Sequence, residues 1–110
     1  MQRDRSFALA WFCLALLSAS PAAAMFENGQ FLYDRCQEES GSLSDGVCSG
    51  FITGVFDANR DAYCAGSEVT ADRLKEVAVS YMREHAQVLT QPAGSIVHDA
   101  LSEAFPCSGR

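Results

Sequence analysis

The stretch Cys48-Ser49-Gly50-Phe51-Ile52-Thr53-Gly54-Val55-Phe56-Asp57 decides how we expect this chain to fold. Its apolar side chains recur at helical spacing, which predicts an amphipathic helix that continues to about Ala62. Gly50 and Gly54 are four residues apart, so they share one side of that helix. Because a glycine costs about 0.8–1 kcal/mol in a helix interior, the pair predicts that another helix approaches closely there. The alternative is that the two glycines have no packing role.

A secretory signal peptide is expected at residues 1–24. Met1–Arg5 is weakly basic, Phe7–Leu17 is apolar, and Ser20–Ala24 ends in the small residues that a signal peptidase cuts after. The apolar run is shorter than the roughly 20 residues that span a bilayer. Cys13 lies inside this run and is removed with it. The mature chain is expected to begin at Met25 and to carry no membrane anchor.

Residues 25–110 are expected to form one small acidic domain. Without the two arginines and the aspartate of the leader, 6 of the 8 basic and 13 of the 14 acidic side chains remain, a net charge of −7. This balance argues against nucleic acid and against anionic membrane surfaces as partners, because both attract basic patches. A basic protein surface would suit the domain better.

Four cysteines remain after the leader is removed, namely Cys36, Cys48, Cys64 and Cys107. In an exported chain, cysteines form disulfides that persist. Zinc binding is the alternative, but the sequence holds no C-x-x-C or H-x-x-x-H pair, and both histidines lie far along the chain from the cysteines. We therefore expect two disulfides and no metal or other cofactor.

Three further helices are expected around the first, separated by polar turns. One runs from about Asn28, a good N-cap, to Cys36, and another from its N-cap Thr70 to His85. The last has Pro92 in its first turn and is stopped by Pro106. The stretch from Gln37 to Gly46 has the composition of a solvated loop, in which Leu43 is expected to point inward. The fold class is thus all-α, a disulfide-stapled bundle of about four helices.

The helix layout restricts the disulfide pairing. Cys48 and Cys64 lie at opposite ends of the predicted central helix, about 24 Å apart at 1.5 Å per residue. A disulfide requires Cα atoms within about 7 Å, so these two cannot pair. If the first two helices form an antiparallel hairpin, Cys36 lies beside Cys48, and Cys64 is left for Cys107. Peptide mapping of the non-reduced protein tests this pairing.

With these pieces assembled, the chain resembles the Rap1a/Tai family of type VI secretion immunity proteins. The matching pieces are Phe26-Glu27-Asn28-Gly29, Cys36, the central motif from Cys48 to Asp57, Val69-Thr70, Leu74, Val77 and Ala104-Phe105-Pro106-Cys107. The resemblance implies a periplasmic helical protein that binds and inhibits a peptidoglycan amidase toxin. It also implies a homodimer.

The resemblance implies a partner contact in the connection from His85 to Gln91, because a projecting loop of the family's immunity proteins enters the amidase cleft. Two consecutive apolar residues lie there between polar ones, where a loop is normally polar. The expected contact residues are Gln87, Val88, Leu89, Thr90 and Gln91. The alternative is that Leu89 packs inward ahead of the last helix.

An enzymatic function is not expected, because neither histidine lies in a recognisable catalytic motif and the cysteines are assigned to disulfides. His98 is expected to be a surface residue. Asp57 is expected to cap a neighbouring helix or to pair with Arg60 or Arg73. The alternative function is a periplasmic chaperone that exposes apolar surface when its carboxylates are protonated in acid, or another helical binding protein without a toxin partner.

Overall fold

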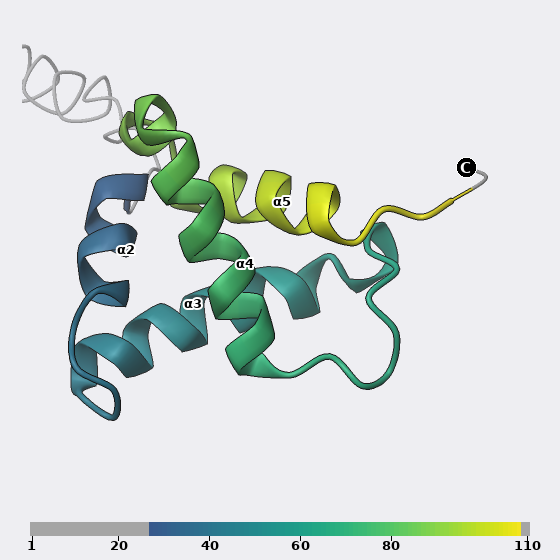
Figure 1. The fold of residues 1–110 in the computed structure, drawn as a ribbon, viewed down its shortest axis with the longest axis horizontal. Helices are drawn as coiled ribbons and strands as arrows, with labels where there is room; N and C mark the ends of the chain where they lie inside the picture. The colour runs from purple at the N-terminus through teal and green to yellow at the C-terminus, as the bar shows by residue number, and fades with distance from the viewer. Residues whose placement is uncertain (1–26, 109–110) are drawn as a thin grey trace, which may run out of the picture.

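The computed structural model describes residues 27–108, which form four α-helices and two short 3-10 helices (Figure 1). The expected signal peptide, residues 1–24, lies outside the described residues. Within the described range the chain contains no strand, so the all-α prediction is confirmed. The elements in order are α2 (Gly29–Cys36), α3 (Leu43–Ala58), η1 (Arg60–Ala62), α4 (Ala71–Glu84), η2 (Ala86–Thr90) and α5 (Ala93–Ala104).

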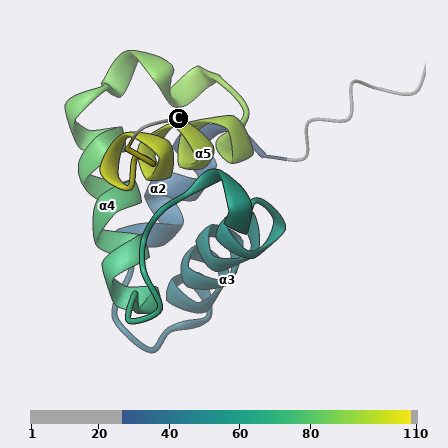
Figure 2. The same cartoon turned by 90° about the vertical axis from the view of Figure 1, so that its right-hand side faces the viewer.

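Each of the four α-helices contacts the other three. In Figure 1, α2 stands upright at one side, α3 runs across below it, and α5 runs across above α3. Figure 2, turned by 90°, shows α4 on one side and α3 at the lower right, with the segment from η1 to α4 looping around the end of the bundle. The two helices expected to form an antiparallel hairpin, α2 and α3, instead cross at a wide angle (Figure 1).

Two predicted helix starts are confirmed by their capping hydrogen bonds. The Asn28 side chain accepts from the backbone N–H of Phe31 at 2.9 Å. The Thr70 hydroxyl accepts from the N–H of Arg73 at 3.1 Å. These bonds satisfy N–H groups that have no partner within the helix itself. Capping is a local interaction, so the sequence alone locates both helix starts.

The predicted start of α3 is wrong. The helix begins at Leu43, inside the stretch expected to be a loop, because Ser42 is an N-cap that accepts from the N–H of Asp45 at 3.1 Å. The Asp45 carboxylate in turn accepts from the N–H of Gly41 at 2.9 Å. This reciprocal arrangement is close to a capping box, whose S-x-x-D spacing is visible in the sequence. The side chain of Leu43 is also expected to point inward, but it is 87% exposed.

The Asp45 carboxylate also pairs with the Lys75 ammonium, which ties the start of α3 to α4. Both side chains are largely buried, at 17% and 24% exposed. The hydrogen bond from Lys75, followed by the one from Gly41, holds the pKa of Asp45 below its usual value. The ion pair therefore contributes to stability at neutral pH, and that contribution is lost in acid as Asp45 is protonated.

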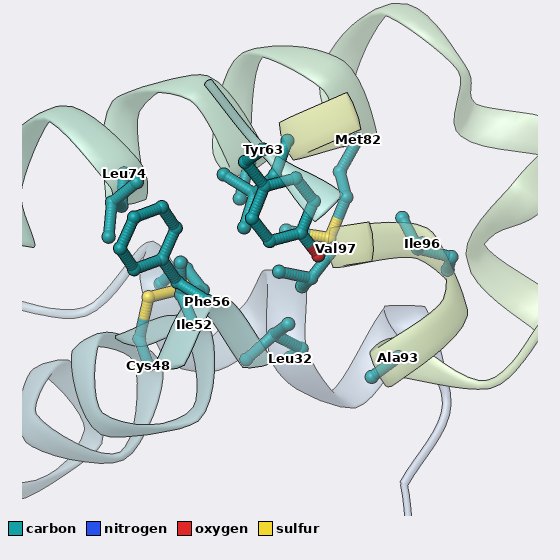
Figure 3. Packing of buried hydrophobic residues seen from close by; sticks show 13 residues of the cluster. Leu32, Cys48, Ile52, Phe56, Tyr63, Leu74, Met82, Ala93, Ile96 and Val97 are labelled. Carbon is teal, nitrogen blue, oxygen red and sulfur yellow. A yellow bond between two sulfur atoms is a disulfide. The ribbon is translucent and has the colours of Figure 1, made fainter. Parts of the chain in front are cut away.

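The hydrophobic core lies between α3, α4 and α5, with α2 closing one end (Figure 3). Every helix supplies residues at helical spacing, as the sequence predicts for α4 and α5. Phe56 stacks on Tyr63 with ring centroids 5.6 Å apart, so the segment after η1 also enters the core. The fully buried large side chains are Leu32, Cys48, Ile52, Met82, Ile96, Val97 and Leu101.

The disulfides join Cys36 to Cys48 and Cys64 to Cys107, the pairing expected from the sequence, with Cα atoms 5.1 and 5.0 Å apart. Because α3 begins at Leu43, the first disulfide joins the last residue of α2 to the second turn of α3. The second ties the segment after η1 to the end of α5, next to a hydrogen bond of 3.0 Å from the Cys64 N–H to the Phe105 carbonyl.

The two central glycines do not admit a neighbouring helix of this chain, which corrects the opening prediction. A Cβ added at Gly50 or Gly54 would meet no atom within 4 Å, and both residues are exposed. The close approach occurs at Gly29 instead. A Cβ there would lie 2.4 Å from Ile96 Cδ1, 3.0 Å from Leu89 Cα and 3.1 Å from the Leu89 carbonyl oxygen. The start of α2 thus packs against the backbone of η2.

Candidate partner-binding site

Four residues of the predicted contact segment, Gln87–Gln91, lie in the 3-10 helix η2, and Gln91 follows that helix directly. Val88 and Leu89 are half-buried and pack against the core. Gln87, Thr90 and Gln91 are exposed. The segment therefore presents two amides and a hydroxyl to solvent, while its apolar pair helps to fix it to the bundle.

Backbone pairing holds η2 beside the start of the described chain. Asn28 and Pro92 form an isolated antiparallel bridge. The N–H of Gly29 donates to the Gln91 carbonyl at 2.9 Å, and the N–H of Ala93 donates to the Glu27 carbonyl at 3.0 Å. Together with the close contact at Gly29, these bonds fix the backbone of η2 before any partner arrives. Such preorganisation lowers the entropy cost of binding.

His85 closes the other end of the segment. Its Nδ1–H donates to the Tyr81 carbonyl oxygen at 2.9 Å, which requires the proton on Nδ1 in the neutral imidazole. The imidazole also stacks on the Tyr81 ring, with centroids 4.2 Å apart. The Val88 N–H donates to the His85 carbonyl at 2.9 Å. His85 therefore links the end of α4 to η2, and its side chain has a structural role there.

A groove between α4 and α5 is lined by Tyr81, Ala100 and the carboxylates of Glu76, Glu84 and Glu103. Arg73 also lines the groove and pairs with Glu76 at 3.2 Å. Burial raises the pKa of Tyr81 above its usual value, and the carboxylates of Asp99 and Glu103 raise it further.

His98 is not the surface residue that the sequence predicts. It is half-buried, and its Nδ1 lies 2.7 Å from the Tyr63 hydroxyl. Burial raises the pKa of Tyr63, with a smaller contribution from Asp99. The sequence holds no sign of this pair, because its members are 35 residues apart. The contact joins α5 to the segment beside the Cys64–Cys107 disulfide.

Asp57 pairs with Arg60 at 2.7 Å, one of the two roles expected for it. Both side chains are more than 60% exposed, so the pair contributes little to stability. In the part of the chain that the structure describes, no three side chains of the histidine, cysteine or carboxylate types gather where a metal ion could be held. No helix in that part has the length and apolar character to cross a membrane.

A comparison with models of known protein families identifies the family of this chain. A family model described as Rap1a immunity proteins matches residues 28–107. The chain belongs to the Rap1a immunity protein family. The match runs from the N-cap of α2 to the last cysteine, so it covers almost all of the described bundle and confirms the resemblance seen in the sequence.

Membership in the Rap1a family implies an immunity protein of type VI effectors, whose partner is a protein. A search of curated protein sequences finds no match to the chain. The features that the family match spans include the Asn28–Pro92 bridge, η2 and both disulfides. The candidate contact segment therefore belongs to the family domain.

Proposed function

We propose that this chain is a periplasmic immunity protein that binds and inhibits a peptidoglycan amidase effector of a type VI secretion system. The observation that carries the proposal is the Rap1a match over residues 28–107. The signal-like sequence of residues 1–24 supports export, and two disulfides suit an oxidising compartment. In this role the chain acts by binding and carries out no reaction.

The groups that could have served as nucleophile or base have structural partners, which supports a binding role. His85 bonds to a backbone carbonyl and His98 to a tyrosine hydroxyl. The four cysteines of residues 27–108 are all in disulfides. A hydrolase of the nucleophile and base type requires these groups close together and free to react.

The proposed contact with the amidase is the segment Gln87–Gln91. Its exposed side chains, Gln87, Thr90 and Gln91, can donate and accept hydrogen bonds in a polar active-site cleft. Val88 and Leu89 pack on the core and so hold these three residues in place on the surface. The carboxylates of Glu84 and Glu103, in the groove between α4 and α5, would favour approach by a basic effector surface. We further propose that the protein is a homodimer.

The experiment first asks whether a cell-wall amidase gene lies beside this gene, and then titrates that amidase with the exported protein, with peptidoglycan hydrolysis as the readout. Stoichiometric inhibition that is complete near one protein per amidase is expected. Full hydrolysis at a large excess of the protein, together with no binding in calorimetry, would reject the amidase as partner. Acid-dependent suppression of the aggregation of an unrelated protein would instead favour the chaperone alternative.

The contact segment is tested with the substitutions Gln87→Trp and Thr90→Trp. Both side chains are exposed, so the larger indole blocks insertion without disturbing the core. The control is Ser67→Trp, at an exposed position before the opposite end of α4. We expect inhibition to weaken by about tenfold or more for the first two and to stay unchanged for the control. Equal inhibition by all three variants would remove η2 from the interface.

A further inference from the structure

The two disulfides of the bundle lie in different environments. Cys36 is 7% exposed and Cys48 is 0% exposed, so we call their bond the core disulfide. Cys64 is exposed and Cys107 is half-buried, so we call their bond the surface disulfide. The rate at which a disulfide exchanges with a thiol depends on access to its sulfur atoms. The two bonds should therefore differ in reactivity while the bundle stays folded.

The core disulfide is protected at both sulfur atoms. In thiol–disulfide exchange a thiolate attacks one sulfur, and the other sulfur leaves as a thiolate. Cys48 cannot be attacked in the folded protein, because solvent does not reach it. An attack on Cys36 would expel the Cys48 thiolate into the apolar cluster that Figure 3 shows around Ile52 and Phe56. Because apolar surroundings disfavour a thiolate, Cys48 is a poor leaving group.

The surface disulfide joins two segments at the edge of the bundle. Cys64 lies in the segment from η1 to α4 that loops around the end of the bundle (Figure 2), and Cys107 lies in the extended chain that leads away from α5 (Figure 1). The sequence neighbours of Cys107, Pro106 and Ser108, are both exposed. Water can therefore hydrate a thiolate that forms at Cys107, which makes it a better leaving group than Cys48.

Three contacts hold the joined segments to the bundle when the surface disulfide is open. Tyr63 is 6% exposed, its ring stacks on Phe56, and its hydroxyl lies 2.7 Å from Nδ1 of His98. The Cys64 N–H donates to the Phe105 carbonyl at 3.0 Å. A disulfide stabilises a protein mainly by restricting the unfolded chain, so these folded-state contacts persist without it. Opening the bond frees the chain after Phe105 and leaves the bundle in place.

We propose that the surface disulfide is a site of thiol–disulfide exchange in the folded protein, at which a low-molecular-weight thiol reacts with Sγ of Cys64, the more exposed of the two cysteines. The sulfur of the attacking thiolate forms a bond to Cys64 Sγ, and the bond between the two Sγ atoms breaks. Cys107 leaves with the bonding electron pair and takes a proton from water. A second thiolate then attacks the mixed disulfide, which reduces the protein by two electrons and oxidises two small thiols to their disulfide.

The exchange site lies at the opposite end of α5 from the proposed effector contact. The helix has 12 residues and therefore spans about 18 Å at 1.5 Å per residue. It begins just after Gln91, and Cys107 follows its last turn. The inference therefore does not rest on the immunity function, and its test requires no effector.

The test incubates the exported protein with reduced glutathione under native conditions. Samples are quenched in acid, free thiols are alkylated, and the peptides are mapped by mass spectrometry. We expect glutathione on Cys64 and alkylation of Cys107, at a rate at least about tenfold above any change at the core disulfide. That rate should rise in proportion to the glutathione concentration, because a reaction limited by unfolding would instead level off.

The control is Gly29→Ala, which crowds α2 against η2 and so destabilises the fold. It should speed the reduction of the core disulfide, which requires opening of the bundle, and leave the exchange at Cys64 unchanged. Circular dichroism of the product with an open surface disulfide should retain the helical signal of the parent.

Each contrary result would overturn a stated part of the proposal. No exchange, or modification of Cys36 or Cys48 as early as Cys64, would reject the surface disulfide as the reactive one. A rate that levels off with glutathione, or that Gly29→Ala raises equally at both disulfides, would show that only the unfolded chain reacts. Glutathione on Cys107 would refute Cys64 as the attacked sulfur. Loss of the helical signal on exchange would refute a reaction confined to the surface.

Discussion

The substitution Gly29→Ala tests how the bundle fixes the start of α2 against η2. The added Cβ would lie 2.4 Å from Ile96 Cδ1 and as close as 3.0 Å to the backbone of Leu89. Ile96 is 1% exposed, so its side chain would have to shift within the core. The Leu89 backbone cannot move freely, because the Asn28–Pro92 bridge holds the two segments together.

The expected loss follows from overpacking in a close-packed region, which typically costs about 1–3 kcal/mol. The gain in helix propensity from glycine to alanine offsets part of this, but Gly29 is only the first residue of α2. For a domain of this size, a loss of about 1 kcal/mol shifts the melting temperature by about 4–8 °C. We therefore expect Gly29→Ala to lower the melting temperature by roughly 5–20 °C.

Circular dichroism during heating, on the exported proteins with intact disulfides, measures this shift. The matched control is Gly94→Ala, in the first turn of α5, where an added Cβ meets no atom within 4 Å. The control should melt at the parent temperature or slightly above it, because alanine replaces glycine without a clash. If Gly29→Ala melted within about 1 °C of the control, the close packing of α2 on η2 would be refuted.

Three further predictions concern stability. The lowered pKa of Asp45 means that the folded state binds a proton less readily than the unfolded state, so Asp45→Asn should reduce the melting temperature at pH 7, and the difference from the parent should shrink as the pH falls below 3.8, the ordinary pKa of an aspartate. His98→Ala leaves the Tyr63 hydroxyl without its partner and should cost about 1–3 kcal/mol in denaturant unfolding, whereas adding Tyr63→Phe should cost little more. Replacing Cys64 and Cys107 together by serine should cost about 4 kcal/mol, and a loss below about 1 kcal/mol would contradict the loop-closure argument.

The local features of the fold are predictable because short stretches determine them. Asn28 and Thr70 begin their helices through hydrogen bonds to residues three positions away. The start of α3 escapes prediction although its signal is equally local, since Ser42 and Asp45 have capping-box spacing. The turn-like composition around them outweighs that signal.

The candidate contact segment can be located from the sequence, but its conformation cannot. The consecutive apolar residues Val88 and Leu89 mark η2, and the structure shows that both pack against the core. Its exposed residues are supported by a bridge between Pro92 and Asn28, which lie far apart in the chain. Nothing in the composition of either segment specifies that pairing, because it depends on how the helices are placed.

The sequence by itself determined the all-α class and the starts of α2 and α4, because helical spacing and capping act within a few turns of chain. It also excluded a Cys48–Cys64 disulfide, but the rest of the pairing was inferred from an antiparallel hairpin of α2 and α3 that the structure does not contain (Figure 1). Only the tertiary structure decided which glycine is required by packing. An added Cβ would clash at Gly29, whereas it would meet no atom within 4 Å at Gly50 or Gly54. It also left Leu43 exposed while drawing His98 inward to Tyr63. The physical reason is that burial depends on the angles at which helices cross, and those angles follow from contacts between residues far apart in the chain.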